Sequence, residues 1–337
     1  MKVVIIGSGF AGITFAEKLH TLNPDARITV ITRESDGFYS RPLLSHGFSK
    51  DAIEQSIILK TFETIRQKGI EVLTETEAEV IDRHHKIVNL AAGSRKTTID
   101  YDVLVLAQGS AAFIPPTLMA DRNNFHLLNS LADLKELRQI RKTLLNKNKP
   151  PHWAIIGGGL IGCEVASDLA VSGDKVSLFH AMDRLMERQL SNGDSAKLLK
   201  ILKNSGVNVL FNQSVTGIDK KSGEILVNSN NGGKFDVALV SCGFKPRTEL
   251  AAAAGLAVNR GIKVNSFMQT TDPAIFAIGD VAELPNGKLY AFILPIRGQA
   301  QWLAEYLVDE DIQPWIAPDF KPKSKVHGFV ADNPQFF

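Results

Sequence analysis

Two glycine-rich loops with the same spacing lie far apart in this chain. The first, GSGFAG, occupies residues 7–12, and the second, GGGLIG, occupies residues 157–162. Each follows an apolar run, at residues 3–6 or 153–156, and leads into a helical pattern. In such a unit the first glycine makes the tight turn, the second lets the backbone approach a pyrophosphate, and the third lets helix and strand pack closely. The pyrophosphate then lies at a helix N-terminus, where N–H groups and the helix dipole favour negative charge.

A single loop of this kind could be a glycine-rich turn without function. Both copies, however, have the flanking strand and helix that the motif requires. The helices also match each other, because Ala16 and Ala166, like Leu19 and Leu169, stand at equal distances from the last glycine of their loops. We therefore predict two dinucleotide sites, and two such sites in one chain indicate two redox cofactors that exchange electrons.

Length and composition agree with this interpretation and exclude several classes. A chain of 337 residues corresponds to about two domains of typical size. The net charge of +2 gives no reason to expect a nucleic-acid or membrane partner. No apolar run approaches the roughly 18 residues of a membrane span, and Met1 leads straight into a strand, as in a protein without a signal peptide. The two cysteines suit a reducing compartment, so we predict a cytoplasmic protein.

The elements around the loops predict an α/β fold with parallel sheets. The expected strands are residues 2–6, 27–32, 85–90, 102–107 and 275–280, with further short strands at 70–100 and 206–242, and the expected helices are 10–22, 61–68, 131–144, 194–204 and 296–308. Pro115 and Pro116 mark a crossing into a second domain. The strand at 275–280 ends in Gly279 and Asp280, and ligands bind at the carboxyl ends of strands in such sheets. Asp280 is therefore a candidate hydroxyl acceptor, although a solvated turn aspartate would also fit the segment alone.

Several segments together resemble the flavoprotein pyridine-nucleotide oxidoreductases, and within them the rubredoxin reductases. Besides the first loop, they are YSRPLLS at 39–45, LVLAQG at 104–109, GLIGCE at 159–164, PRTEL at 246–250 and IFAIGD at 275–280. The resemblance runs from residue 2 to about 310. It implies two Rossmann-like domains of the glutathione-reductase type, with FAD at the first loop and NAD(P)H at the second.

By this resemblance the FAD domain is discontinuous. It is expected at 1–115 and 243–310, with the NAD(P)H domain at 116–242. Residues 311–337 resemble only the start of a C-terminal α+β interface domain, which we expect to be truncated or missing, because the sequence stops at Phe337. Oligomeric state is left open for the same reason.

The resemblance also carries over site residues one by one. Around FAD we expect Gly7, Gly9, Phe10, Ala11, Gly12, Glu34, Arg41, Pro42, Ala107, Gly109, Gly279, Asp280 and Pro295. Around NAD(P)H we expect Gly157, Gly159, Leu160, Ile161, Gly162, Glu164, His180, Arg184 and Gly243. No metal site is predicted.

Two of these residues are expected to act on the flavin chemistry. In the family a basic residue of the Ser-x-Pro segment faces the flavin and pairs with a glutamate after the second loop, which implies Arg41 and Glu164. A cation beside the isoalloxazine favours the electron-rich reduced flavin. Arginine replaces the usual lysine, and it is more rigid and always charged. An exposed carboxylate in a helix first turn is the alternative for Glu164.

The two ribose positions depart from the usual pattern. The acid expected at the end of the second strand is absent, where Thr32 stands, and Glu34 could replace it or be a solvated loop charge. In the second unit the strand ends at His180, with Asp183 and Arg184 after it. An acid there would select NADH, whereas cations tolerate a 2′-phosphate. The choice between NADH and NADPH therefore stays open.

The cysteines exclude a thiol route for the electrons. Cys163 and Cys242 are widely separated, both look like small buried hydrophobes, and the segment 40–45 contains no thiol. We therefore expect electrons to pass from NAD(P)H through FAD to a separate one-electron carrier, which the resemblance to rubredoxin reductases implies is rubredoxin. A ferredoxin or flavorubredoxin is the alternative carrier, and a flavin-bearing regulator that senses NAD(P)H is the alternative of another class.

Overall fold

The computed structural model describes residues 1–147, 149–221, 223–309, 311–321, 323–332 and 334. It divides into two compact units. Unit 1 comprises Met1–Ser40, Ile58–Ala111 and Lys245–Phe320, and unit 2 comprises Arg41–Ile57, Ala112–Phe244 and the described residues from Lys321 onward. None of the helices in the described residues has the length and apolar character that crossing a membrane requires.

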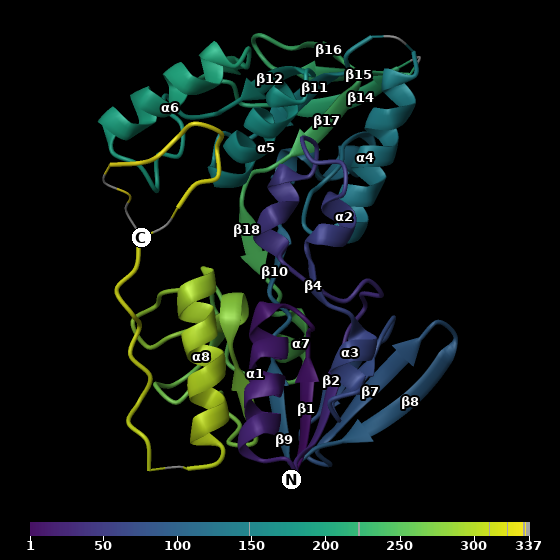
Figure 1. Cartoon of the computed structure of the whole chain (residues 1–337), viewed down its shortest axis with the longest axis vertical. Coiled ribbons are helices and arrows are strands. Elements are labelled where there is room, and N and C mark those ends of the chain that lie inside the picture. Colours follow the sequence, from purple (N-terminus) through teal and green to yellow (C-terminus); the bar gives the residue numbers. More distant parts are fainter. Residues whose placement is uncertain (148, 222, 310, 322, 333, 335–337) are drawn as a thin grey trace. The chain divides into compact units, whose positions relative to one another are not determined.

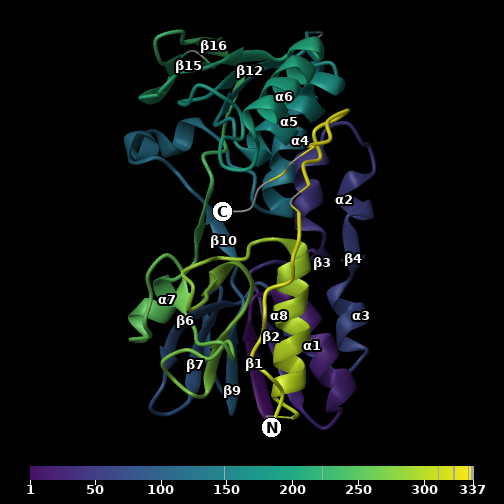
Figure 2. The same ribbon diagram turned by 90° about the vertical axis from the view of Figure 1, so that its left-hand side faces the viewer.

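Unit 1 is built on a five-stranded parallel sheet. The strand order is β20 (Ile275–Ala277), β9 (Val103–Leu106), β1 (Lys2–Ile6), β2 (Arg27–Ile31) and β5 (Glu71–Leu73). The apolar runs predicted as strands are almost completely buried, as expected for parallel strands with covered faces. Two helices, α1 (Phe10–Leu22) and α8 (Ile293–Tyr306), lie side by side (Figures 1 and 2).

A three-stranded antiparallel sheet completes the main features of unit 1. Its strands are β6 (Glu77–Asp82), β7 (Ile87–Ala92) and β8 (Arg95–Asp100). The remaining elements are β3 (Phe38–Tyr39), β4 (Ile58–Lys60), α3 (Phe62–Arg66), α7 (Glu249–Ala253), β19 (Ile262–Lys263), η3 (Gly279–Val281) and β21 (Ala282–Glu283). Two short strands, β10 (Ser110–Ala112) and β18 (Phe244–Pro246), lie where the chain passes between units.

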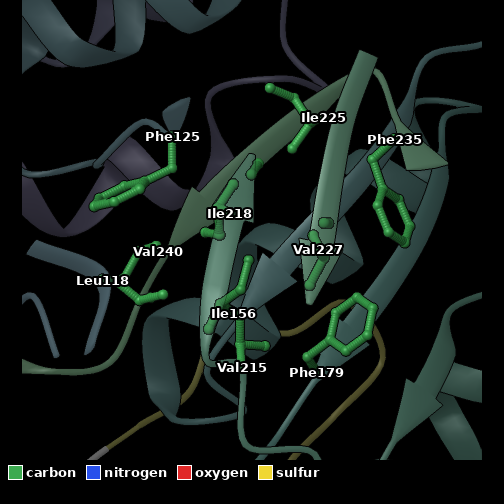
Figure 3. Packing of buried hydrophobic residues seen from close by; sticks show 12 residues of the cluster. Leu118, Phe125, Ile156, Phe179, Val215, Ile218, Ile225, Val227, Phe235 and Val240 are labelled. Carbon is green, nitrogen blue, oxygen red and sulfur yellow. The ribbon is translucent and has the colours of Figure 1, made fainter. Parts of the chain in front are cut away.

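Unit 2 repeats the parallel-sheet arrangement with four strands. Their order is β13 (Asn208–Leu210), β12 (Lys175–Phe179), β11 (His152–Ile156) and β17 (Val237–Val240). A second, antiparallel sheet contains β14 (Gly217–Lys221), β15 (Glu224–Asn228) and β16 (Gly233–Phe235). Aromatic and branched side chains from both sheets, including Phe179, Ile218 and Phe235, form one apolar cluster (Figure 3). This cluster holds the carboxyl ends of β11 and β12 in place beside the second loop.

Helices supply the rest of unit 2. They are η1 (Arg41–His46), α2 (Ile53–Ser56), η2 (Pro116–Asn124), α4 (Leu131–Leu145), α5 (Leu160–Val171) and α6 (Asn192–Asn204). The start of α4 is fixed as predicted, because Ser130 and Asp133 form a capping box. In the turn between β15 and β16, the Gly232 N–H donates to the carbonyl of Ser229.

Several boundaries differ from the sequence-based expectations, among them the end of β20 at Ala277 rather than residue 280 and the three that follow. Helix α8 begins at Ile293 rather than near residue 296, because Pro295 in a first turn lacks only an N–H that would be unpaired anyway. Strand β7 begins at Ile87 rather than His85, since Lys86 has a φ of +53° and forms the turn. Residues 41–57 and those after Lys321 group with unit 2, although the predicted domains placed the former with the FAD domain. The functional assignment of the domains stays a prediction.

Candidate cofactor sites

The first loop has the geometry that its three glycines predict. Gly7 has a φ of +116°, and a Cβ there would overlap the carbonyl oxygen of Ala107 at the end of β9. A Cβ at Gly12 would overlap the carbonyl oxygen of Gly7, so helix and turn approach as closely as glycine allows. At Gly9, by contrast, a Cβ would meet no described atom within 4 Å. The second glycine therefore faces open space, as a phosphate-binding loop requires.

The second loop repeats this arrangement. Gly157 has a φ of +112°, and its Cβ would overlap the carbonyl oxygen of Ser241 just beyond β17. A Cβ at Gly162 would overlap the carbonyl oxygen of Gly157, whereas at Gly159 nothing described lies within 4 Å. The two loops thus have the same backbone geometry, which follows from the same strand–turn–helix connection in each unit.

Both loops leave a helix N-terminus for an anionic ligand. Gly9 and Gly159 are the N-caps of α1 and α5, and neither helix receives a side-chain cap. No acidic side chain lies in either first turn, which contains Phe10 and Ala11 in one helix and Leu160 and Ile161 in the other. The N–H groups of these turns are therefore available to a pyrophosphate, and the open space at the N-caps fits it.

Asp280 lies at the carboxyl end of the unit 1 sheet, as predicted, and is fixed in place. It follows β20 directly and accepts a hydrogen bond from the Ser110 hydroxyl at 2.5 Å. The neighbouring Gly279 has a φ of +76°, and a Cβ there would lie 2.9 Å from the Ala11 Cβ. Asp280 thus lies in the same unit as the first loop, and Gly279 packs against α1, the helix that follows that loop.

Sequence reasoning missed Gln299 of α8, which lies next to this site. Its Oε1 accepts from the Gly279 N–H at 2.8 Å, whereas its buried Nε2 has no partner in the described residues. The buried Oε1 of Gln108 likewise has no hydrogen-bond partner among the residues that the structure describes. Unpaired buried polar atoms are costly, so both fit a polar ligand that the loop would hold. Only the packing of α8 against α1 brings Gln299 here.

The end of β2 is closed by Thr32 rather than by an acid. The hydroxyls of Thr32 and Ser8 lie 2.7 Å apart, and the Glu34 N–H donates to the Thr32 hydroxyl at 3.1 Å. Glu34 accepts from the Tyr39 hydroxyl at 3.0 Å, which holds its carboxylate near the first loop. A role for Glu34 at the FAD ribose stays a prediction.

His180 occupies the matching position in unit 2 and supports the second loop. Its side chain is 7% exposed, and its Nδ1 accepts from the Gly158 N–H at 3.0 Å. This ring nitrogen therefore carries no proton, and Nε2 lies near the Arg184 carbonyl at 2.9 Å and the Glu187 carboxylate at 3.2 Å. The Arg184 guanidinium donates to the carbonyls of Leu190 and Glu187, both at 2.8 Å. Both cationic candidates are thus engaged within the protein.

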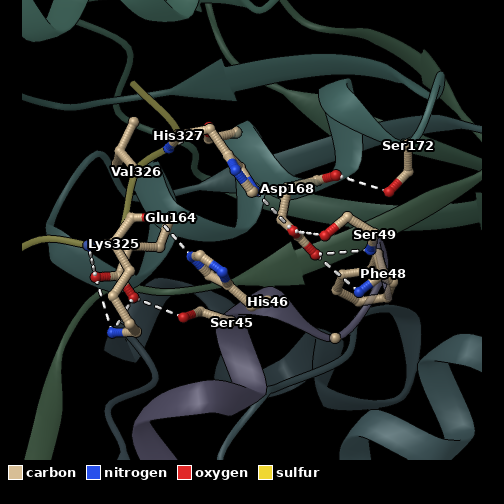
Figure 4. A network of polar contacts seen from close by, with 12 residues as sticks. Ser45, His46, Phe48, Ser49, Glu164, Asp168, Ser172, Lys325, Val326 and His327 are labelled. Atoms are coloured by element: carbon tan, nitrogen blue, oxygen red, sulfur yellow. Dashed lines mark hydrogen bonds and ion pairs between the residues drawn. The ribbon is translucent and has the colours of Figure 1, made fainter. Parts of the chain in front are cut away.

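Glu164 has a different partner from the one we predicted. Its side chain is 0% exposed, and its carboxylate lies 2.8 Å from the Lys325 ammonium. It also accepts from the Lys325 N–H at 2.7 Å and from the Ser45 hydroxyl at 2.6 Å (Figure 4). In the described residues the cation on Glu164 is thus Lys325 and not Arg41, whose guanidinium donates to the Asn129 carbonyl. The sequence did not predict Lys325 as the partner of Glu164, because this ion pair joins α5 to a segment far away in the sequence.

The thiols are unsuited to electron transfer. Burial, and then the charges of Glu164 and Glu187, raise the pKa of Cys163 far above its ordinary value. Burial raises the pKa of Cys242 to about 11. Because the thiolate is the reactive form, both cysteines are inert at neutral pH. Cys163 is fully buried as expected, whereas Cys242 is only partly buried.

The other residues carried over from the resemblance lie at element ends. Pro42 is in η1, Ala107 follows β9, and Pro295 lies buried in the first turn of α8. Gly109 and Gly243 have φ values of +66° and +113° and face space in which a Cβ would meet no described atom within 4 Å. Their contacts with cofactors stay predictions.

Two phosphate-binding loops on two parallel sheets define a dinucleotide-dependent oxidoreductase. The model of the pyridine nucleotide-disulphide oxidoreductase family matches residues 1–301. The chain belongs to this family, and FAD and NAD(P)H are its cofactors.

The chain is also similar to several named reductases. A nitric oxide reductase FlRd-NAD(+) reductase of Aliivibrio fischeri is 35% identical over 314 residues, which cover 92% of this chain and 80% of the relative. A rubredoxin-NAD(+) reductase of Acinetobacter baylyi is 32% identical over 317 residues, covering 91% and 78%. A crystal structure of a ferredoxin reductase from Rhodopseudomonas palustris has a TM-score of 0.84 and 27% identity, covering 95% of this chain and 78% of the other.

Proposed function

We propose that this protein is an FAD-dependent NAD(P)H:rubredoxin reductase of the cytoplasm. The observation that carries the proposal is the pair of equivalent loops, each open at its second glycine, in a chain whose two cysteines are free and at least partly buried. Because Cys163 and Cys242 are both free, they form no disulfide that could accept electrons, and we infer that the electrons leave to a separate carrier. Likeness to reductases named for rubredoxin and for a flavorubredoxin-type protein supports a small one-electron carrier as that partner.

The residues of the chain would bind and orient, because the cofactors supply the redox chemistry. Bound FAD would convert a two-electron donor into a source of single electrons. The first-turn N–H groups that follow Gly9 and Gly159 would hold the pyrophosphates, and Asp280 would accept a hydrogen bond from a hydroxyl of the FAD chain. Arg41 would stabilise the reduced flavin electrostatically. Glu164, fixed by Ser45 and Lys325, would act as a positioning residue beside the second loop.

Stopped-flow mixing tests the identity of the carrier. The NADH-reduced protein is mixed with a panel of rubredoxins, ferredoxins and flavorubredoxins, and flavin reoxidation is followed by absorbance. We expect rubredoxins to reoxidise the flavin fastest. Faster reaction with a flavorubredoxin would favour the alternative that the A. fischeri relative suggests. Slow reoxidation by every carrier, together with a change of shape on reduction, would instead indicate an NAD(P)H-sensing regulator.

We also propose that NADH is preferred over NADPH. His180 ends the strand at which a ribose-binding acid usually selects the nucleotide. Its Nδ1 is used by Gly158 and the Arg184 guanidinium by carbonyls, while the Glu187 carboxylate, 25% exposed, lies beside the His180 ring. Among the described residues, this arrangement offers the Glu187 charge to a 2′-phosphate, and the neighbouring exposed cation, Arg188, lies 4.0 Å from Glu187 as its partner.

Replacing Glu187 by Gln should therefore lower the preference for NADH. Removing one repulsion of about 1.4 kcal/mol corresponds to a roughly tenfold change in the NADH/NADPH ratio of kcat/KM. The matched control is Glu224→Gln, a surface acid of the antiparallel sheet in unit 2, which should leave the ratio unchanged. An equal ratio in Glu187→Gln and wild type would remove Glu187 from the ribose site.

A further inference from the structure

Three potential metal ligands from distant parts of the chain meet in unit 2. His46 ends η1, Asp168 lies in α5, and His327 belongs to the segment after Lys321. One ligand atom from each residue lies within 4.8 Å of the others. The two imidazole rings stack with centroids 4.8 Å apart, and Figure 4 shows them converging with the Asp168 carboxylate. The sequence gives no sign of this cluster, because its members are separated by more than one hundred residues.

The carboxylate is held in place by backbone and hydroxyl donors. Asp168 is completely buried and accepts from the N–H groups of Phe48 and Ser49 at 2.8 and 3.1 Å, and from the Ser49 hydroxyl. Such bonds orient a ligating carboxylate before any ion arrives. The backbone donors use Oδ2, so Oδ1 is the oxygen that faces His327, at 2.9 Å from its Nε2.

The histidines have matching geometry. His46 Nε2 lies 2.5 Å from the carbonyl oxygen of Lys325 and must donate to it, which leaves Nδ1 as the unprotonated nitrogen. A metal-binding histidine usually binds the ion through one ring nitrogen and donates the N–H of its other ring nitrogen to a carbonyl or carboxylate. For His327, moving the ring proton from Nε2 to Nδ1 would free Nε2. Two ligands about 2.0–2.1 Å from a tetrahedral ion are roughly 3.3 Å apart, so the present 2.9 Å requires only a small separation.

We propose that His46, Asp168 and His327 form a binding site for a divalent transition metal ion of the zinc class. Two imidazoles and one carboxylate suit Zn²⁺ or Co²⁺, with water at the remaining position. Calcium and magnesium are disfavoured because they require oxygen ligands.

Binding would fasten the segment after Lys321 to α5. This segment contributes Lys325 to Glu164, and the His327 N–H donates to Ser167 at 3.1 Å. It is also tied to α6, since the Asp332 N–H donates to Asp194 at 2.9 Å. A metal ion on His327 would therefore stabilise the position of Lys325 against Glu164, and it would do so whichever carrier the protein reduces.

The test compares metal binding by tag-free protein with two conservative variants. His46→Gln and His327→Gln replace the imidazoles by amides, which keep a donor near the Lys325 carbonyl and Asp168 but remove the strong nitrogen ligand. Zn²⁺ binding is measured by competition with a chromogenic chelator, and the site is viewed through the visible absorption of bound Co²⁺. Thermal unfolding with and without Zn²⁺ gives a readout that does not depend on activity.

A matched control is available at the surface. His84 and His85 lie in a turn next to Asp82, with His85 Nδ1 2.8 Å from that carboxylate, and would compete for added metal. We expect wild type and His85→Gln to bind one Zn²⁺ per chain and to be stabilised by it equally. Each amide variant should bind at least tenfold more weakly and lose the thermal shift.

Unchanged binding in both amide variants, or loss of binding in His85→Gln, would overturn the proposal. If one amide variant unfolds at a lower temperature without metal, the other variant decides, because His46 bonds to the Lys325 carbonyl whereas His327 bonds to Asp168. Absence of Zn²⁺ binding by wild type would show that the cluster is only a hydrogen-bonded contact between the segment and α5.

Discussion

Replacing Gly9 by Val should yield a folded protein that purifies without FAD. A side chain at Gly9 would occupy the open space in front of the α1 N-terminus, which is where a pyrophosphate must lie. The substitution meets no described atom within 4 Å, and the φ of –71° at this position is accessible to valine. The fold should therefore survive, unlike in Gly7→Val or Gly12→Val, where backbone overlap would disrupt the turn. Flavin absorbance per chain and circular dichroism measure the two properties separately.

The second loop supplies the control for this experiment. Gly159 has the same open surroundings and an extended backbone, so Gly159→Val should keep its FAD. Its flavin should no longer be reduced at low NADH concentration, because the nucleotide's pyrophosphate would be displaced instead. If Gly9→Val retained a full complement of FAD, or if wild type could not be reconstituted with FAD, the assignment of the first loop would fail.

Truncating Glu164 to Ala should slow flavin reduction by NADH while FAD remains bound. The carboxylate is fully buried, and removing one member of a buried ion pair typically costs about 3–5 kcal/mol. Because Lys325 is 28% exposed, water can rehydrate its ammonium, and we expect the lower end of that range in stability. Misplacement of the helix start beside the second loop should affect reduction further, since near-attack geometry is sensitive to shifts of about 1 Å. Stopped-flow reduction and thermal unfolding measure the two effects.

Variants of Lys325 and Arg41 separate the contribution of the Glu164–Lys325 ion pair from the effect of a cation on the flavin. Lys325→Met removes the ammonium but leaves the backbone N–H on Glu164, so we expect a smaller loss of stability than in Glu164→Ala. Arg41→Ala should lower the reduction potential of the flavin if Arg41 faces it, whereas Lys325→Met should keep the potential closer to that of wild type. Wild-type reduction rates in Glu164→Ala would make Glu164 a structural residue only, and an unchanged potential in Arg41→Ala would contradict a role of Arg41 beside the flavin.

The sequence by itself determined the two loops and the elements that position them. Local signals suffice for this, because each glycine's role depends on the strand before it and the helix after it. The buried strands at β1, β9 and β11 and the start of α4 at Leu131 followed from patterns a few residues long. Asp280 was predicted at the edge of the sheet for the same reason, since the end of a buried strand marks the edge where ligands bind, and its role toward FAD stays a prediction.

Only the tertiary structure decided the partners of the buried charges. Glu164 pairs with Lys325, and Asp168 binds His327, because the segment after Lys321 runs along α5. Nothing in the sequence near residues 164 or 168 encodes that contact, and an arginine at position 41 was a reasonable alternative cation. The unprotonated Nδ1 of His180 was equally hidden, because its tautomer depends on an N–H from Gly158, far away in sequence. A charge buried in a fold takes the partner that packing brings within reach, and sequence spacing does not determine which one that is.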